Sequence, residues 1–391
     1  MAELPTPNND LYIGIMSGTS LDGIDVALAR FSNSVEFVAH NAYPFSSEVR
    51  DLLYHIATTR QIDLDLFVRS HFLLARLYAD AVNETFKTNN LKREDIRAIG
   101  LHGQTVRHLP APDKVTGDTQ PIGATFQLGS GPAVAALTGI DTVSDFRSGD
   151  VALGGEGAPL VPMFDSVFLG SDDTTRIALN IGGISNITVI APTKSNVPII
   201  AYDTGPGNMI IDELSRRYYH KAYDDNGEIA ANATTNERLL SEMLSHPYFQ
   251  MLPPKSTGRE LFGSQFLTHI ATAIDSGAIS DADAIRTATE LTVRSIANEI
   301  LRYASLYSPM CDLIVSGGGV HNNFLMSRLQ ELLPMCRIMR SDEFGIPSQA
   351  KEAIAFAFFA KAFLEKNIIH QPSTTGASEK IILGSLSHGK Q

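Results

Sequence analysis

The chain has 391 residues, of which 43% are hydrophobic and 19% charged, and a formal net charge of −12 at pH 7. This length and composition predict a globular protein of two domains with a large core. The negative charge, with no Lys/Arg cluster to offset it, argues against nucleic acid or an anionic membrane as a partner.

The compartment can be inferred from the cysteines and from the apolar stretches. Cys311 and Cys336 lie in apolar surroundings and lack metal-ligand spacing, which favours a reducing compartment. The polar N-terminus, MAELPTPNND, does not resemble a secretory signal. The most apolar stretch, residues 353–364, is interrupted by Lys361 and is too short to span a bilayer. We therefore expect a cytoplasmic protein.

The first predicted element is a strand–loop–strand unit over residues 10–31. Apolar side chains recur at every second position in 11–15 and again in 24–28, which predicts two strands. The loop Ser17–Gly23 contains glycines and hydroxyls, and these with the backbone amides are typical of a phosphate-binding turn. An ordinary hairpin with a polar turn is the alternative. Asp22 in this loop is either a Mg²⁺ ligand through water or an acid that tightens the turn.

The next elements alternate between helices and strands. Periodicity predicts helices over 48–58 and 65–88 and a strand over 96–101, which ends in the polar loop 102–105, HGQT. Strand ends in α/β sheets usually present ligand groups, although His102 alone is more simply a histidine in a turn. A strand over 125–128, a helix over 131–139 and a strand over 142–144 follow. Residues 145–162 form either a linker or a binding loop, and their charged side chains favour a binding loop.

The second half repeats the first design. Residues 176–190 predict two strands joined by Gly182-Gly183, and a strand over 197–202 leads into Asp203. Helices are expected over 209–219, 237–245, 283–307 and 349–363, and a strand over 313–315 precedes Gly317-Gly318-Gly319. Two strand–glycine turn–strand units about half the chain apart suggest a duplicated fold that holds a nucleotide in its cleft. This layout resembles that of the sugar kinase, Hsp70 and actin superfamily.

Asp203 is the candidate catalytic residue. A carboxylate at a strand end beside phosphate-binding turns suits a general base that acts on water or a hydroxyl. The alternative is an Asp that caps the helix beginning after Pro206. Glu343 follows a later strand beside another acid, and such pairs in loops are usually solvated.

Seven motifs in order carry a closer resemblance. They are MSGTSLDGID (16–25), LHGQTVRH (101–108), DFRSGDVALGGEGAPLVP (145–162), LNIGGISN (179–186), YDTGPGN (202–208), PKSTGRE (254–260) and SGGG (316–319). Together they resemble the 1,6-anhydro-N-acetylmuramic acid kinase family over nearly the whole chain. The combination of the first, third and fifth is highly specific.

This resemblance implies an α/β, two-domain actin-like ATPase (ribonuclease H-like) fold with a nucleotide cleft between its lobes, residues 1–143 with 349–391 and residues 144–348. It implies a homodimer that uses ATP and Mg²⁺ to convert 1,6-anhydro-N-acetylmuramic acid to N-acetylmuramic acid 6-phosphate. Asp203 matches the base that deprotonates water, while Thr105 and Glu343 resemble positions lining the sugar. The implied nucleotide contacts are Ser17, Gly18, Thr19, Ser20, Leu21, Asp22, Gly23, Ile24, Gly182, Gly183, Gly317, Gly318 and Gly319.

Two departures and two alternative functions accompany the resemblance. Ile15 stands where the superfamily often has Asp, so the metal ligand cannot be assigned by analogy. Glu156 stands where the family usually has Gln, which changes the charge near the cleft. A kinase for another sugar or small acid is one alternative, since fold alone does not fix substrate. An actin-like or Hsp70-like ATPase that uses ATP for conformational change or assembly is the other.

Overall fold

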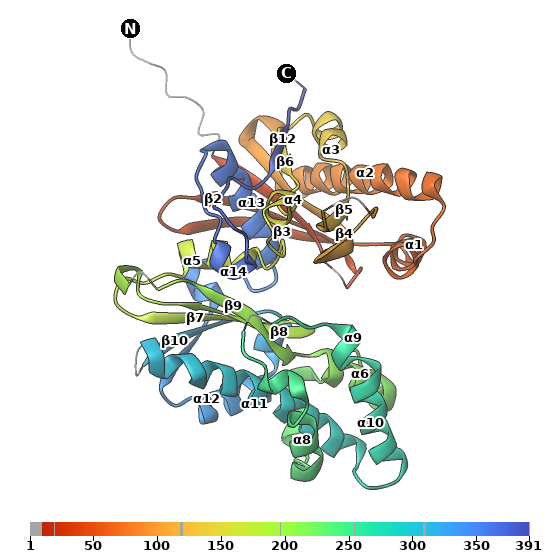
Figure 1. The fold of residues 1–391 in the computed structure, drawn as a ribbon, viewed down its shortest axis with the longest axis vertical. Helices are drawn as coiled ribbons and strands as arrows, with labels where there is room; N and C mark the ends of the chain where they lie inside the picture. Colours follow the sequence, from red (N-terminus) through yellow and green to blue (C-terminus); the bar gives the residue numbers. More distant parts are fainter. Residues whose placement is uncertain are drawn as a thin grey trace. The chain divides into compact units, whose positions relative to one another are not determined.

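The computed structural model describes residues 10–18, 20–117, 120–195, 197–253, 255–307 and 310–390. The chain divides into two compact units, each with its own β-sheet (Figure 1). Unit 1 comprises Met1–Phe164 and Ala350–Gln391, and unit 2 comprises Asp165–Gln349.

Unit 1 contains the N-terminal strands and both ends of the chain. Its strands are β1 (Leu11–Ser17), β2 (Gly23–Phe31), β3 (Val35–Pro44), β4 (Ile96–Asp113), β5 (Ile122–Leu128), β6 (Thr142–Ser144) and β12 (Ser385–Ser387). Its helices are α1 (Ser47–Thr58), α2 (Leu64–Asn89), η1 (Arg93–Asp95), α3 (Gly131–Thr138), α4 (Ser148–Ala152), α13 (Lys351–Leu364) and α14 (Pro372–Thr375), while α5 (Val161–Phe168) crosses the boundary between the units.

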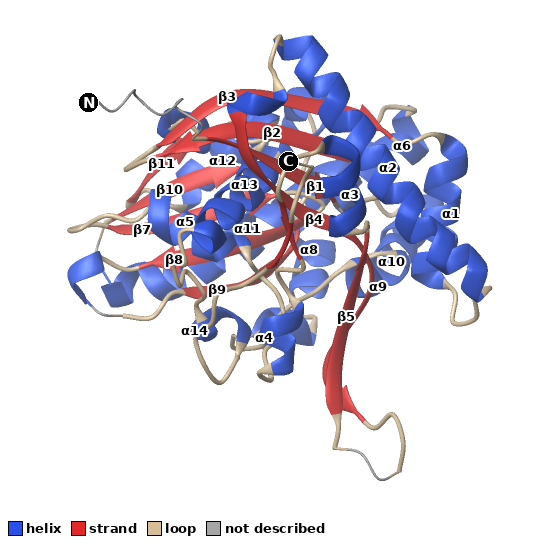
Figure 2. Cartoon of the chain, turned by 90° about the horizontal axis from the view of Figure 1, so that it is seen from above, coloured by secondary structure: helices blue, strands red, loops and turns tan. Residues whose placement is uncertain are grey.

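The sheet of unit 1 has the order β12-β6-β4-β1-β2-β3. Strands β1, β2 and β3 pair antiparallel, whereas β4 runs parallel to both β1 and β6. Strand β5 pairs antiparallel with β4, and the two extend from the sheet as a two-stranded ribbon (Figure 2). This pairing corrects the sequence prediction for 102–105, because β4 continues through the HGQT segment instead of ending before it.

Helices cover both faces of this sheet. Successive residues of a strand point to opposite faces, so neighbouring residues of β1 contact different helices. Ile13 and Ile15 of β1 join a buried cluster that includes Leu74 of α2. On the other face a Cβ on Gly14 would lie 1.7 Å from the Ala353 carbonyl oxygen of α13. The glycine therefore lets the backbone of α13 lie directly against the strand.

Unit 2 contains the second glycine hairpin. Its strands are β7 (Thr175–Ile181), β8 (Ile184–Ile190), β9 (Ile200–Pro206), β10 (Cys311–Ser316) and β11 (Cys336–Arg340). Its α-helices are α6 (Met209–Tyr219), α7 (Glu228–Ala231), α8 (Glu237–Leu244), α9 (Arg259–Phe262), α10 (Ser264–Asp275), α11 (Asp281–Tyr307) and α12 (Asn323–Leu332). Its 3₁₀ turns are η2 (Thr193–Ser195), η3 (Asp225–Gly227), η4 (Pro247–Gln250), η5 (Gly318–His321) and η6 (Ser341–Phe344).

The sheet of unit 2 repeats the topology of unit 1. Its order is β11-β10-β7-β8-β9, in which β7, β8 and β9 pair antiparallel and β10 is parallel to its two neighbours. The same order, β6-β4-β1-β2-β3, forms the main part of the unit 1 sheet. The duplication expected from the two glycine hairpins is therefore present in the topology.

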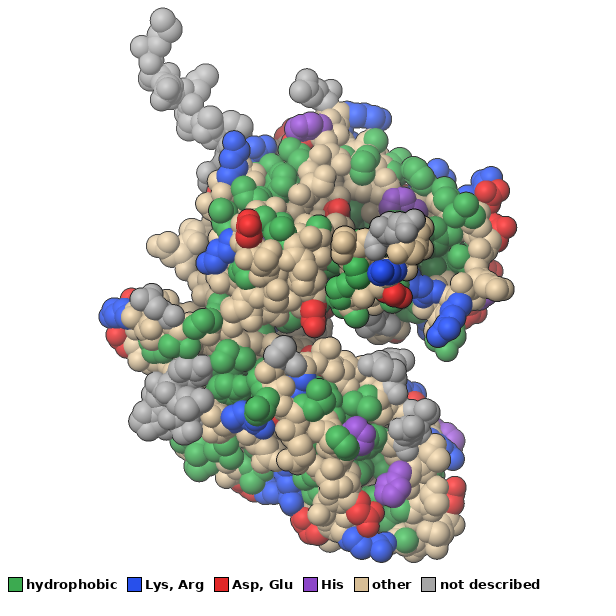
Figure 3. Space-filling view, in the orientation of Figure 1, with side chains coloured by type: hydrophobic (Ala, Val, Ile, Leu, Met, Phe, Trp, Pro, Cys, Tyr) green, Lys and Arg blue, Asp and Glu red, His purple; other side chains and the backbone are tan. Residues whose placement is uncertain are grey.

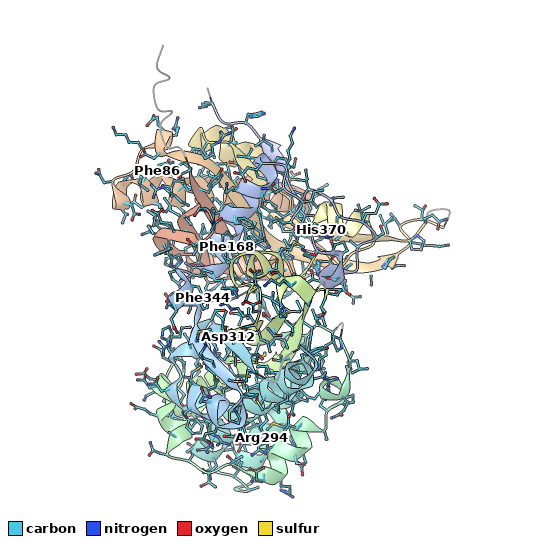
Figure 4. All side chains as sticks on the ribbon, turned by 90° about the vertical axis from the view of Figure 1, so that its left-hand side faces the viewer. Phe86, Phe168, Arg294, Asp312, Phe344 and His370 are labelled. Atoms are coloured by element: carbon cyan, nitrogen blue, oxygen red, sulfur yellow. The ribbon has the colours of Figure 1, made fainter. Side chains whose placement is uncertain are left out.

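A buried carboxylate ties together the parallel strands of unit 2. Asp312 of β10 (labelled in Figure 4) forms ion pairs with Arg176 of β7 at 3.3 Å and with Arg337 of β11 at 3.0 Å. Helix α11 turns an apolar face inward, because its Leu291, Ile296 and Ile300 are all buried.

The surface in Figure 3 shows acidic and basic side chains interspersed with apolar ones. Among the described residues, helices that combine the length and the apolar character needed to cross a bilayer are absent.

Candidate active site

Two glycine turns and the start of α6 meet in unit 2. The Gly182-Gly183 turn joins β7 to β8, and the backbone N–H groups of Gly207 and Asn208 donate to the carbonyls of Gly183 and Gly182, each at 2.8 Å. A Cβ on Gly207 would lie 2.3 Å from the Gly182 oxygen, so a side chain at this position would separate the two segments. The Met209 N–H also donates to the Gly183 carbonyl, at 3.2 Å, so the β7–β8 turn is fixed beside the N-terminus of α6.

The third glycine segment packs against the end of β7. Gly317 has φ +83°, a conformation that favours glycine, and begins the η5 turn after β10. A Cβ on Gly319 would lie 2.4 Å from Ile181 Cγ2. Asn208 Nδ2 donates to the Ile181 carbonyl at 3.1 Å. Unit 2 therefore brings together all five of its predicted nucleotide-contacting glycines.

Asp203 lies on the strand that leads into this cluster. It is half-buried within β9, opposite Asn186 of β8, and one of its carboxylate oxygens accepts the Thr257 N–H at 2.9 Å. The sequence prediction that the strand ends at residue 202 is wrong, because pairing with β8 extends β9 through Pro206. The helix-cap interpretation is also wrong, because the N-cap of α6 is Asn208.

Tyr248 contributes an ionisable group beside Asp203, and Asp212 contributes one at the start of α6. The Tyr248 hydroxyl donates to the Asp203 carbonyl at 2.7 Å, and burial with the charge of Asp203 raises the pKa of Tyr248, which keeps this donor protonated. Asp212 lies in the first turn of α6, and burial raises its pKa to about 6 although Arg216 opposes the shift. The sequence motifs do not single out Asp212. Its position between buried residues of an amphipathic helix was the available signal.

The predicted phosphate loop begins where β1 of unit 1 ends. The buried Ser17 hydroxyl is 2.6 Å from the Tyr78 hydroxyl, and the Gly18 carbonyl accepts from Gln104 Nε2 at 3.0 Å. Leu21 has φ +60°, unusual for a residue with a side chain and common at functional sites. Thr19 lies outside the described residues.

The remaining residues of the predicted phosphate loop, 20–24, differ in exposure and in secondary structure. Ser20 and Asp22 are exposed, whereas Gly23 and Ile24 already belong to β2. A Cβ on Gly23 would lie 2.4 Å from the Tyr43 carbonyl oxygen of β3, so packing between the strands explains this glycine.

The HGQT segment carries buried polar groups inside β4. His102 Nε2 accepts from Arg147 Nη2 at 2.7 Å, and burial together with the Arg147 charge lowers the pKa of His102 to about 3. The interpretation of His102 as a turn histidine is therefore wrong. Thr105 is half-buried and pairs with Gln127 of β5.

Residues 145–162 form an ordered, hydrogen-bonded segment of unit 1. Arg147 Nη1 donates to the Gly157 carbonyl at 2.5 Å. The buried Asp150 carboxylate accepts from Gly157 N and Thr375 Oγ1, each at 2.6 Å, and from His370 Nε2 at 2.5 Å (His370 is labelled in Figure 4). The C-terminal segment thus holds this loop in place, which argues against a plain linker.

Two predicted acids, Glu343 and Asp22, are exposed. Glu343 lies in η6 rather than in an irregular loop, and its Oε1 accepts the Arg340 N–H at 2.8 Å. In the described part of the chain, groups of three or more His, Cys, Asp or Glu side chains placed to hold a metal ion are absent. Asp22 is thus a single carboxylate without such a cluster.

Comparison with known proteins identifies relatives along nearly the whole chain. A family profile described as anhydro-N-acetylmuramic acid kinase matches residues 10–389. Proteins of that name from Vibrio parahaemolyticus and Bacillus thuringiensis are 41% and 38% identical to the chain, over 97% and 96% of its length and 98% of theirs.

Solved structures align over a similar length with much lower identity. The activator of the 2-hydroxyisocaproyl-CoA dehydratase from Clostridium difficile is 10% identical, covers 91% of this chain and 96% of its own, and has a TM-score of 0.46. A ROK family glucokinase from Streptomyces griseus is 12% identical, covers 90% and 99%, and has a TM-score of 0.39.

The duplicated sheets and the sequence matches define a two-domain α/β sugar kinase with the actin-like ATPase fold. The seven motifs that suggested the resemblance all fall within the matched residues. The chain belongs to the anhydro-N-acetylmuramic acid kinase family.

Proposed function

We propose that the protein uses ATP to convert 1,6-anhydro-N-acetylmuramic acid to N-acetylmuramic acid 6-phosphate in peptidoglycan recycling, with Asp203 as the general base. The family match over residues 10–389 supports the substrate and the reaction. One observation supports the role of Asp203. Its carboxylate is held by the Thr257 N–H, and β9, on which it lies, ends at the Gly182-Gly183 turn and Asn208.

In the proposed reaction, a single proton transfer to Asp203 accompanies opening of the 1,6-anhydro bridge of the sugar. Its carboxylate removes a proton from water as the water oxygen bonds to C1 and the C1–O6 bond breaks. The electron pair released to O6 attacks the γ-phosphorus, and ADP leaves. Strain in the bicyclic sugar favours the opening, and O6 needs no separate base because it leaves C1 as the nucleophile.

The glycine segments would supply nucleotide contacts. We assign Ser17–Ile24 to the phosphates, and Gly182, Gly183 and Gly317–Gly319 to the remainder of ATP. Backbone N–H groups in such turns bind phosphate without a basic cluster, which agrees with the acidic composition. Thr105 and Glu343 are proposed to line the sugar. Glu156, in place of the family's usual Gln, would then add charge to the same region.

Mg²⁺ is proposed as the accompanying ion. It usually takes few protein ligands and several waters, and it binds mainly through nucleotide phosphates. Asp22, an exposed carboxylate in the proposed phosphate loop, would hold such an ion through water. When bound, the ion would neutralise charge that develops on the transferred phosphoryl group.

Two further properties are proposed from the resemblance. We expect a homodimer, which sedimentation would detect, and a cytoplasmic location, where the thiols of Cys311 and Cys336 remain reduced. Filaments formed with ATP during sedimentation would instead favour the actin-like alternative.

Turnover in ¹⁸O-labelled water tests the proposed reaction. The label is expected at C1 of the product sugar phosphate. Label in phosphate would indicate that water attacks ATP, and the proposed chemistry would then be wrong. Equal turnover of the anhydro sugar, open-chain N-acetylmuramic acid and glucose would contradict the substrate assignment.

A further inference from the structure

Three hydrogen bonds hold Asp203, two of them with residues 255–257 and the third with Tyr248 of η4. The Thr257 N–H donates to the Asp203 carboxylate at 2.9 Å, and the Asp203 N–H donates to the Lys255 carbonyl at 3.3 Å. The Asp203 carbonyl accepts the Tyr248 hydroxyl at 2.7 Å. The position of the carboxylate therefore depends on where residues 255–257 lie.

Lys255 fixes this segment from inside the unit. Its side chain is 0% exposed, and its ammonium group pairs with Glu299 Oε1 of α11 at 2.8 Å. The same Nζ donates to the Tyr248 carbonyl at 3.4 Å and lies 4.8 Å from the centre of the Tyr248 ring. A fully buried ammonium cannot be presented to a nucleotide phosphate, so direct contact with ATP does not explain this lysine.

Glu299 has other partners that connect the pair to β9. Its Oε2 accepts the Tyr202 hydroxyl at 2.8 Å and lies 3.2 Å from Arg302 Nε. Burial and the charge of Glu299 raise the pKa of Tyr202, which keeps this hydroxyl a donor. Tyr202 directly precedes Asp203 on β9. The Glu299 carboxylate is therefore bonded both to β9, through Tyr202, and to the segment 255–257, through Lys255.

The energetics favour a positioning role over a stabilising one. Charges buried in a pair lose about as much hydration energy as they gain in attraction, so such pairs add little stability compared with apolar residues. Their hydrogen bonds are strong and directional, and they fix geometry. We propose that Lys255 is a positioning residue that acts through residues 255–257 to set the Asp203 carboxylate for catalysis. This inference rests on the proposed role of Asp203 as the base.

The test begins with Lys255→Met, which keeps most of the side-chain volume and removes the ammonium. Glu299 retains Tyr202 and Arg302 as partners in this variant. We expect kcat to fall about 10- to 100-fold, as small displacements of catalytic groups do. The Kd for ATP should stay within about threefold, because the glycine turns are untouched.

Helix α11, which carries Glu299, also carries a second buried acid that offers a matched control. Glu290 of α11 is a buried carboxylate paired with Arg328 at 2.6 Å, and Arg294 and Arg286 remain beside it at 3.4 and 3.7 Å. Arg328→Met thus removes one partner of a buried acid far in sequence from Asp203. It should lower Tm as Lys255→Met does and leave kcat within about twofold.

The decisive measurement places Lys255→Met in an Asp203→Asn background. If Lys255 acts through the base, the second substitution should lower the residual kcat no further. Equal kcat losses in Lys255→Met and Arg328→Met, or a full Lys255→Met loss on top of Asp203→Asn, would overturn the inference. An active Asp203→Asn protein would instead contradict the proposed function.

If Lys255→Met does not fold, Lys255→Met combined with Glu299→Gln removes both charges and carries the same expectations for kcat and for the Asp203→Asn background.

Discussion

A Cβ on Gly319 would lie 2.4 Å from Ile181 Cγ2, so the turn after β10 closes directly against the end of β7. Gly183, two residues beyond Ile181, has more space. Among the described residues, the atom nearest to a Cβ at Gly183 is Met209 Cβ at 3.9 Å, an ordinary contact. Packing therefore explains Gly319, whereas the fold leaves room at Gly183, where we propose that the nucleotide binds.

Gly183→Ala should separate binding from folding. We expect Tm to be nearly unchanged and the Kd for ATP to rise about 10-fold, because the methyl group would occupy space that the nucleotide approaches. Titration calorimetry and thermal unfolding check these two values. Gly319→Ala should instead lower stability by about 1–3 kcal/mol through overpacking. Unchanged ATP affinity in Gly183→Ala would show that the nucleotide does not approach this turn.

Asp203→Asn should remove catalysis and spare binding. The amide oxygen still accepts the Thr257 N–H, but it no longer takes a proton from water. We expect kcat to fall about 10³-fold or more, within the range of general base catalysis, with the Kd for ATP unchanged. The matched control is Asp283→Asn, whose carboxylate likewise accepts a backbone N–H, from Thr234 at 2.7 Å. Equal activity in the two variants would exclude Asp203 as the base.

The two glycine hairpins and the helix after residue 130 could be predicted from the sequence, because each depends on residues close together in the chain. Alternating apolar residues around Ser17–Gly23 and around Gly182-Gly183 identified both hairpins, because strand periodicity and turn residues are properties of adjacent positions. The helix predicted over 131–139 forms as Gly131–Thr138, with Gly139 in the left-handed conformation at its end.

Long-range pairing explains what the sequence did not predict. The HGQT segment stays in β4 because β5, more than twenty residues later, pairs with it. Asp203 lies inside β9 because Ile184 of β8 pairs with Pro206. Lys255 and Glu299 are 44 residues apart, and their side chains pair because the folded chain brings residues 255–257 beside α11. Such contacts have no local signature.

The Asp150 cluster gives a prediction of stability in unit 1. Burial raises the pKa of Asp150, but hydrogen bonds from His370, Thr375 and Gly157 outweigh burial and hold it below the usual value. Asp150→Ala leaves these buried donors unpaired and should cost about 2–4 kcal/mol in the free energy of unfolding. Urea unfolding measures this loss. Thr375→Val removes only one of the three donors to Asp150 and should cost about 1 kcal/mol. Equal losses in the two variants would show that Asp150 does not stabilise the fold through all three donors.

Asp212 should make stability depend on pH. Its pKa is raised from 3.8 to about 6 in the folded chain, so its stabilising contribution is full below pH 3.8 and lost as the pH rises through about 6. Asp212→Asn mimics the neutral carboxyl and should be about 1 kcal/mol more stable than the natural chain at pH 8, once solvent screening is allowed for. At pH 5 the difference should shrink. Urea unfolding at both values tests this, with Glu213→Gln, whose side chain is 44% exposed, as the neighbouring control. A gain in Asp212→Asn that is the same at both pH values would mean that the charge of Asp212 is not its cause.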